Sequence, residues 1–339
     1  MQRLQGLYNN IPAFQTDNPR INIYNITICL IALVKFYTTG LYKYTVCTAR
    51  KFQQGVNKVL MTIKIVTDST ADLPADIVKN LGITVVPLYV HFGNEVFRDG
   101  VDINKETFFD RLINGGIHPK TSQPSPEDFA NVYRELAKDN ATGIVSIHIS
   151  SKFSGTYQSA MEGAKISGVS CPIEVIDSRL LSMGMGLIIK AAAIASRSGK
   201  KLGDIVEDCK NNIPKIKLMG FFDTLRYVQV GGRLGKAKIL MGSLLGVKPV
   251  LTVADGEYQP CGRVRNTAKG LERLVEFAKT GKNIVDLSVI HSTTPETAHK
   301  LVEMLSDIFP KDQTIIAQLG AVLGTHGGPG TLWVAYKEA

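Results

Sequence analysis

From Met61 to the end of the chain, short apolar strands alternate with segments of helical periodicity. Strands are expected at 63–67, 83–89, 143–149 and 173–176. Helices are expected at 73–81 and from Ser125, a capping residue followed by Pro126 at the first helical position, through residue 136. Because strands that alternate with helices favour a mainly parallel sheet with helices on its faces, residues 61–213 are expected to form a first α/β lobe.

The pattern changes beyond residue 213. Strands are expected at 249–253, 257–262, 284–291 and 332–336, with two further segments at 217–222 and 314–318. The dipeptide Asp255-Gly256 between two of these strands is typical of a hairpin turn. A helical pattern at 295–305 and a Gly-rich loop at 324–330 complete the segment. Residues 214–339 are therefore expected to form a second lobe of α+β type, which makes the chain a two-domain α/β protein.

Residues 1–60 differ from the rest of the chain, being rich in Asn, Tyr, Lys and Thr. Their apolar run, 26–34, is far shorter than the roughly 20 residues that a membrane-spanning helix needs. The run also lies too far along the chain for a signal peptide, and no small-residue cleavage site follows it. Since the strand pattern begins at Met61, we interpret residues 1–60 as an extension, either a mis-assigned start or a disordered segment, and expect no transmembrane segment.

The net charge of +9 is concentrated in this extension, with seven basic and one acidic side chain in residues 1–60. Residues 61–339 carry 32 basic and 29 acidic side chains, so their excess is small and lacks the concentrated basic face of nucleic-acid-binding proteins. No nucleic-acid partner is therefore expected. The five cysteines are scattered without a CxxC pair, which favours reduced thiols and a cytoplasmic location.

Motifs for nucleotides and metals are missing from the sequence. The stretch 231–237, GGRLGKA, has neither the spacing nor the hydroxyl of a Walker loop. Gly184-x-Gly186 lacks the third glycine of a dinucleotide fingerprint and sits in a helical pattern, so close helix packing explains it better. The six histidines form no HExxH pair. Neither a metal nor a nucleotide cofactor is expected.

Two hydroxyl-rich stretches, 121–125 (TSQPS) and 150–156 (SSKFSGT), each precede a helical pattern. Free backbone N–H groups and the helix dipole make such positions favourable for an anion, although ordinary helix capping explains many of them. Both stretches are expected at the carboxyl ends of strands, where ligands of open α/β sheets bind. We therefore regard them as candidate parts of one anion site.

A third candidate is His326, in the Gly-rich stretch 324–330. An imidazole without bulky neighbours can donate a hydrogen bond to an oxyanion, although a single loop histidine is more often structural. Arg233, after two glycines, and the pair Arg263 and Arg265 are candidate anion contacts, because guanidinium groups bind carboxylate or phosphate with two hydrogen bonds. Solvated arginines are the alternative.

The set of motifs resembles the DegV family, fatty-acid-binding proteins that serve as the B component of bacterial fatty acid kinase. The resemblance covers residues 61–339 and rests on five stretches in order: VTDSTADLP at 66–74, TSQPS at 121–125, FSGTYQSA at 153–160, GGRLG at 231–235 and HGGPG at 326–330. It implies a two-domain DegV-like fold around one fatty acid, whose chain runs in an apolar tunnel. An apolar segment at 239–245 is our expected tunnel wall.

The resemblance also implies roles for the candidate residues. Thr121 and Ser154 would bind the carboxylate of a long-chain fatty acid with His326 close by, while Arg233 and one of Arg263 or Arg265 would face the phosphate or the kinase. An ATP-binding kinase subunit would make the acyl phosphate, so this chain would be a lipid-binding protein of phospholipid metabolism without catalytic residues. A serine hydrolase of acyl esters that uses Ser154 and His326 is the alternative, although Lys152 replaces the first glycine of a GxSxG elbow.

Overall fold

The computed structural model describes residues 62–240 and 246–339. They belong to one compact unit, Met61–Ala339. The predicted extension, 1–60, and residues 241–245 of the predicted tunnel wall lie outside the described residues. Among the helices of the described part, none is long and apolar enough to cross a membrane.

The first sheet has four parallel strands in the order β2-β1-β6-β7. They are β1 (Thr62–Asp68), β2 (Thr84–Val86), β6 (Ala141–His148) and β7 (Ile173–Asp177). This confirms the predicted parallel sheet. The single strand predicted at 83–89 is wrong, because β2 ends before Pro87 and the chain then enters a different sheet. That sheet is antiparallel with the order β4-β3-β5, from β3 (Tyr89–Phe92), β4 (Glu95–Arg98) and β5 (Lys120–Ser122).

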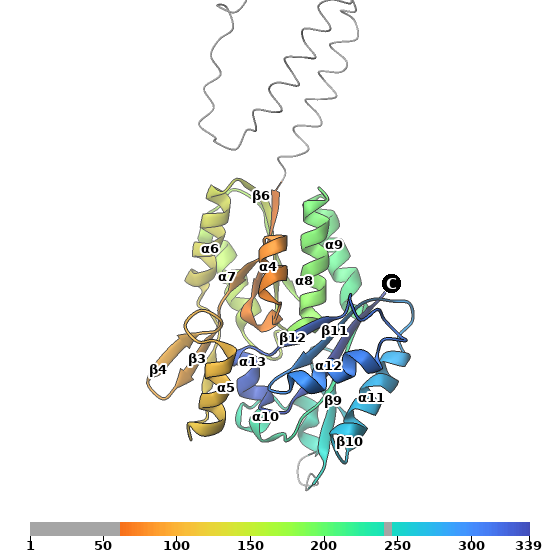
Figure 1. Cartoon of the computed structure of the whole chain (residues 1–339). Coiled ribbons are helices and arrows are strands. Elements are labelled where there is room, and N and C mark those ends of the chain that lie inside the picture. The colour runs from red at the N-terminus through yellow and green to blue at the C-terminus, as the bar shows by residue number, and fades with distance from the viewer. Residues whose placement is uncertain (1–61, 241–245) are drawn as a thin grey trace, which may run out of the picture. The chain divides into compact units, whose positions relative to one another are not determined.

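Helices cover both faces of the first sheet, as Figure 1 shows. They are α4 (Ala75–Leu81), α6 (Pro126–Lys138), α7 (Thr156–Ser167), α8 (Ser182–Arg197) and α9 (Leu202–Asn212). Helix α6 begins as predicted, with a reciprocal capping box between Ser125 and Asp128. Alternate residues of β1 point to opposite faces, so Ile63 and Ile65 join the large core while Val66 packs beneath α6 and α7.

The second sheet has six strands in the order β10-β9-β8-β13-β11-β12, with β11 and β12 parallel and the other neighbours antiparallel. They are β8 (Ile216–Phe221), β9 (Lys248–Ala254), β10 (Glu257–Val264), β11 (Ile284–His291), β12 (Ile315–Gln318) and β13 (Leu332–Glu338). The predicted hairpin is confirmed, since Asp255 and Gly256 both adopt positive φ, 53° and 80°. Helices α11 (Thr267–Lys279) and α12 (Pro295–Met304) pack on one face.

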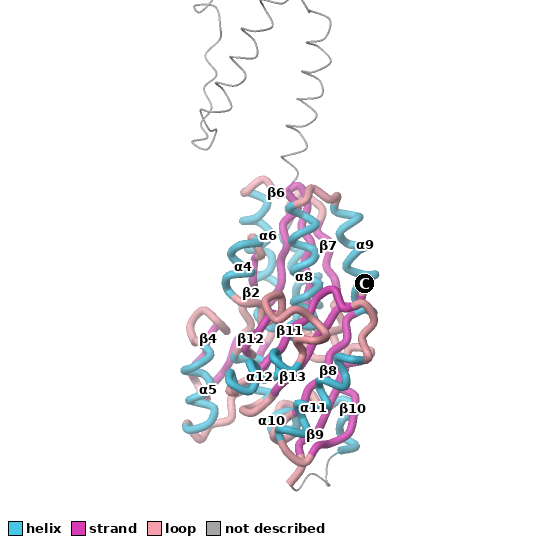
Figure 2. Tube along the Cα trace, turned by 45° about the vertical axis from the view of Figure 1, so that its right-hand side comes forward, coloured by secondary structure: helices cyan, strands magenta, loops and turns pink. Residues whose placement is uncertain are grey.

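Helix α8 packs on strands of both larger sheets, which run through the interior in Figure 2. Its residues from Ser182 to Ile189 are buried. Gly186 allows the close packing predicted from sequence, because a Cβ there would lie 3.1 Å from the carbonyl oxygen of Ala71. One hydrophobic core therefore continues from the first sheet through α8 to the second. The boundary at 213–214 between two lobes stays a prediction.

The loop predicted at 324–330 is wrong in its first half. Residues Ala321–Gly327 form a helix, α13, which ends at Gly328 with a φ of 71°. Local propensity does not favour a helix in so short a Gly-containing stretch. Instead, the N–H groups at its start donate hydrogen bonds to the side chains of Asp72 and Asp99, which are far away in the sequence. Two further elements near α13 matter below: the short helix η1 (Ser69–Ala71) and α10 (Arg226–Val230).

Candidate functional site

A cavity of about 290 Å³ lies where the two larger sheets and the small antiparallel sheet come together. Residues in or next to the strands of all three sheets line it. Four of the sequence candidates line it together: Thr121, Ser154, Arg233 and His326. The remaining lining is mostly apolar, with Leu88, Ile149, Phe153, Leu181, Tyr258, Val322 and Leu323 beside Thr70, Ser122 and Gln123. The cavity thus combines a polar group of side chains with an apolar wall, which is the usual character of a small-molecule site.

Thr121 is held by strand β5 and not by a loop, contrary to the sequence interpretation. It pairs with Val90 of β3, and its half-buried side chain reaches the cavity. The Oγ1 atom of Thr121 lies 3.0 Å from Nε2 of His326, which is 205 residues away in the sequence. The hydroxyl-rich stretch and the Gly-rich stretch therefore meet at one hydrogen bond.

His326 lies in the last turn of α13 and is 9% exposed. Burial, together with the positive charge of Arg233 and the nearby His118, lowers the pKa of its imidazole from 6.5 to about 4. The ring is therefore neutral at pH 7. Its Nδ1 atom is buried and has no hydrogen-bond partner among the described residues. That nitrogen rests against Gly231, where a Cβ would lie 2.0 Å away.

A neutral imidazole offers one donor and one acceptor, so two arrangements of the bond to Thr121 exist. If Nε2 carries the proton, it donates to Thr121, and the Thr121 hydroxyl hydrogen is available to an acceptor in the cavity. If Nδ1 carries the proton, the hydroxyl donates to Nε2 and presents only lone pairs to the cavity. An anion in the cavity favours the first arrangement, because only that one gives it a donor.

Ser154 lies just before α7, whose N-cap residue is Gly155. Its Oγ atom is 2.8 Å from Oγ1 of Thr156 and accepts a hydrogen bond from the Thr156 N–H. The space beside Gly155, which the missing side chain leaves open, is filled by the side chain of Gln123. A Cβ on Gly155 would lie 2.3 Å from Oε1 of Gln123. Gln123 also donates to Ser159 of α7 at 3.0 Å. It thereby ties the stretch of Thr121 to that of Ser154.

Arg233 follows α10 and is the candidate arginine that lines the cavity. Its Nε donates to the carbonyl of Phe153 at 3.3 Å and its Nη1 to that of Gly231 at 2.6 Å. In residues 62–240 and 246–339, no carboxylate forms an ion pair with it. Arg263 and Arg265 are exposed and do not line the cavity. The structure therefore brings one of the three candidate arginines to the cavity.

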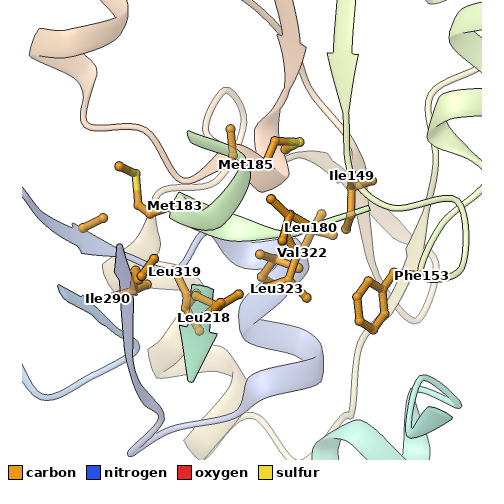
Figure 3. Close-up of a cluster of buried hydrophobic side chains, with 14 of the residues drawn as sticks. Ile149, Phe153, Leu180, Met183, Met185, Leu218, Ile290, Leu319, Val322 and Leu323 are labelled. Atoms are coloured by element: carbon orange, nitrogen blue, oxygen red, sulfur yellow. The ribbon is translucent and has the colours of Figure 1, made fainter. Parts of the chain in front are cut away.

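The apolar wall differs from the one expected. Of the segment 239–245, Ile239 is 78% exposed and Leu240 is absent from the lining, so the prediction is wrong for these two residues. The wall comes instead from elements that sequence reasoning did not select. Figure 3 shows Val322 and Leu323 of α13 next to Leu180, with Ile149 and Phe153 at one side of the cluster.

A second, much smaller hollow of about 10 Å³ extends the apolar interior. It shares Leu181, Tyr258 and Leu323 with the cavity and is also lined by Phe222 and Trp333. The ring centroid of Tyr258 lies 4.7 Å from that of Phe153 and 5.9 Å from that of Trp333. Aromatic side chains thus pack against one another beside the cavity.

Thr70 and Leu88 are lining residues that sequence reasoning missed. Thr70 belongs to the stretch VTDSTADLP, to which no role was assigned. Its N–H donates to Asp68 at 3.0 Å, and Asp68 also accepts from the Ile149 N–H at 3.1 Å. The order of small polar residues in that stretch was the available signal, but nothing local indicated that it faces the cavity.

The geometry does not assemble a serine hydrolase. His326 contacts Thr121 through Nε2, whereas the hydrogen bonds of Ser154 go to Thr156. A hydrolytic triad requires an acid on the second ring nitrogen, and Nδ1 of His326 has no partner in the described part of the chain. A metal site is not formed either, since the described residues contain no group of three or more His, Cys, Asp or Glu that can hold an ion.

Comparison with known proteins matches this arrangement to one family. A family model described as an uncharacterised protein of the DegV family matches residues 62–339. A DegV domain-containing protein of Caldanaerobacter subterraneus is 37% identical over 279 residues, which cover 81% of this chain and 99% of the relative.

Solved structures agree in fold. A solved structure of a DegV family protein from Thermus thermophilus, which is described as binding fatty acid, is 36% identical to this chain and has a TM-score of 0.74. The match covers 82% of this chain and all of the relative. DegV of Bacillus subtilis, described as a fatty acid binding protein, is 31% identical with a TM-score of 0.74, and 82% of this chain again covers all of it. The family model over residues 62–339, the relative covered over 99% of its length and the agreement in fold show that this chain belongs to the DegV family.

Proposed function

We propose that this protein binds one long-chain fatty acid in the cavity and presents its carboxylate to an ATP-binding fatty acid kinase subunit. The observation that carries the proposal is the meeting of Thr121, Ser154, Arg233 and His326 at a cavity whose other walls are largely apolar. The Thermus thermophilus and Bacillus subtilis relatives, both described as binding fatty acids, support the ligand class.

The apolar wall would supply most of the affinity. Burying about 15 CH₂ groups contributes on the order of 10 kcal/mol at roughly 0.8 kcal/mol per group. A hydrogen bond to the head group contributes about 1–3 kcal/mol even when charged. Thr121, Ser154 and His326 therefore act mainly on the orientation of the ligand, so that its carboxylate stays at the polar side of the cavity.

The carboxylate would meet hydrogen-bond donors and one permanent positive charge. Thr121 donates when Nε2 of His326 carries the proton, Ser154 offers a second hydroxyl, and the guanidinium of Arg233 adds positive charge. A bound anion would also favour the charged imidazole and raise the pKa of His326 from about 4. The site can thus add a proton, and with it a positive charge, when negative charge builds up.

Phosphorylation would take place on the carboxylate while the fatty acid stays bound. The partner would bring ATP, and a carboxylate oxygen would attack the γ-phosphate, giving acyl phosphate and ADP. The residues proposed to face the phosphate or the partner are Arg233 at the cavity, Arg263 near the end of β10 and Arg265, which directly follows that strand. This role belongs to phospholipid metabolism and places the protein in the cytoplasm.

Mass spectrometry of the protein under native conditions tests the binding step. A fatty acid that co-purifies in a one-to-one complex, and that is identified after extraction, supports the proposal. The phosphorylation step is tested by adding ATP and a fatty acid kinase subunit to the loaded protein. The acyl phosphate that forms is trapped with hydroxylamine and measured as the hydroxamate. Ester hydrolysis that is lost in Ser154→Ala, without any bound lipid, would contradict the proposal and revive the hydrolase alternative.

A further inference from the structure

Helix α13 carries His326 at one end, and two buried carboxylates hold its other end. The Gly320 N–H, at the N-cap, donates to Oδ1 of Asp72 at 2.7 Å. The Ala321 N–H donates to Oδ1 of Asp99 at 2.8 Å, and the Val322 N–H donates more weakly to its Oδ2 at 3.4 Å. These donors are groups that a short helix leaves unpaired, so the two carboxylates complete the helix start.

The two carboxylates fit this place because of a glycine. A Cβ on Gly320 would lie 3.0 Å from Oδ2 of Asp99 and 3.3 Å from Oδ1 of Asp72. Both carboxyl groups are nearly inaccessible, at 5% exposure for Asp72 and 6% for Asp99. Lys105 supplies positive charge nearby, and its Nζ donates to the carbonyl of Gln318, two residues before the N-cap, at 2.7 Å.

Both carboxylates are themselves anchored to other parts of the structure. The hydroxyl of Ser182, the first residue of α8, donates to Oδ2 of Asp72 at 2.5 Å. Ser69 hydrogen-bonds to Asp99 and also accepts from the N–H of Leu88, a cavity residue, at 3.1 Å. Asp72 and Ser69 both belong to the stretch VTDSTADLP, whose Thr70 lines the cavity.

We propose that Asp72 and Asp99 are positioning residues for the head-group site: they fix the start of α13 and thereby hold His326 against Thr121. The proposal rests on the proposed function for its effect on ligand binding. Between the start of α13 and His326, the helix contributes Val322 and Leu323 to the lining of the cavity. A shift of its first turn therefore moves the apolar wall and the imidazole together.

The test uses Asp99→Asn in the full chain, with Asp102→Asn as the matched control. Asp102 lies in the same turn but pairs with Arg98 at the surface and makes no contact with α13. The variant amide keeps the size of the carboxyl group but turns one acceptor into a donor that faces the Val322 N–H. Two signals are measured: the ¹⁵N resonances of the His326 imidazole in lipid-free protein, and the dissociation constants of palmitic and oleic acid.

We expect the His326 resonances to change and the fatty acid affinity to fall by about fivefold or more in Asp99→Asn, as for a misplaced buried hydrogen bond. Asp102→Asn should change neither. Unchanged His326 resonances in folded Asp99→Asn would overturn the proposal. Should this variant not fold, Ser69→Ala removes a hydrogen bond to Asp99 without changing a residue of α13, and the same two outcomes apply. If the wild-type protein binds no fatty acid, the proposed function fails, whereas the His326 resonances still test the positioning role.

Discussion

A Cβ atom on Gly231 would lie 2.0 Å from Nδ1 of His326, so the backbone of one Gly-rich stretch is the surface on which the imidazole of the other rests. On the opposite side of the ring, Nε2 is hydrogen-bonded to Oγ1 of Thr121 at 3.0 Å. The imidazole is therefore confined between a backbone and a hydroxyl from distant parts of the chain. Its position, and not its charge, is what the surrounding structure maintains.

Gly231→Ala should displace His326 from Thr121. The added methyl overlaps the imidazole and lies tightly, at 3.2 Å, against the carbonyl oxygen of Tyr227, so the ring must move. We expect the free energy of unfolding to fall by about 1–3 kcal/mol, as for other overpacked sites, and fatty acid binding to weaken. Urea unfolding and calorimetric titration with palmitic acid measure the two effects.

The control for this substitution is Gly203→Ala. Gly203 lies in helix α9, and a Cβ there would meet nothing within 4 Å. Alanine should stabilise the helix by about 0.5–1 kcal/mol and leave ligand binding as it is. If Gly231→Ala changes stability and ligand binding in the same way as Gly203→Ala, the close packing of Gly231 against the His326 ring has no role in the site.

Thr121→Val should keep the fold and weaken ligand binding. Valine has nearly the shape of threonine but removes the partner of His326 Nε2 and the donor proposed for the carboxylate. A loss of about 1–2 kcal/mol in binding free energy, or roughly fivefold to thirtyfold in affinity, is expected. Thr121→Ser, which restores the hydroxyl, should recover most of the affinity. Equal affinity for the valine and serine variants would remove Thr121 from the head-group site.

His326 and Asp72 should give the stability of the protein opposite dependences on pH. The pKa of His326 is lowered by burial from 6.5 to about 4, so the unfolded chain binds more protons between these values. Its contribution is fully present above pH 6.5 and is lost as the pH falls toward 4. The pKa of Asp72 is raised by burial from 3.8 to about 7. Its contribution is fully present below pH 3.8 and is lost as the pH rises through 7.

The two slopes oppose each other between about pH 4 and 6.5, each by at most about 1.4 kcal/mol per pH unit. His326→Gln should therefore leave a protein whose unfolding free energy decreases more steeply with rising pH than that of the wild type. Asp72→Asn should change the slope in the other direction. Urea unfolding across this pH window measures both, and parallel curves for wild type and both variants would contradict the assigned protonation states.

Arg263→Ala and Arg265→Ala should separate ligand binding from phosphorylation. Both side chains are exposed and lie outside the cavity lining. We expect the dissociation constant of palmitic acid to stay as in the wild type, while acyl phosphate formation with the kinase subunit falls for at least one variant, since removing a rim charge slows association. Arg273→Ala is the control, because this α11 side chain pairs with Glu276 and also lies outside the cavity lining. Full kinase turnover in both variants would exclude these arginines from the partner surface.

Much of the fold was predictable because its signals are local. The alternation of strands and helices, the capping box at Ser125 and the hairpin at Asp255-Gly256 each depend on neighbouring residues, and the structure has all three. The stretches 121–125 and 150–156 and the residue His326 were also selected locally, by their hydroxyl groups, imidazole and small neighbours. The choice of Thr121 and Ser154 within those stretches came from the resemblance to the DegV family.

Local residue patterns were enough to predict the alternating strands and helices of this chain and the stretches chemically suited to an anion. The three-dimensional fold was needed to show that His326 lies on a helix, that its ring is neutral, and that Leu323, and not Ile239, borders the cavity. The reason is physical: α13 starts on carboxylates more than 200 residues away in the sequence, Asp72 and Asp99, and His326 is bonded to a residue 205 positions away. Contacts of that range leave no periodic or local mark in the sequence.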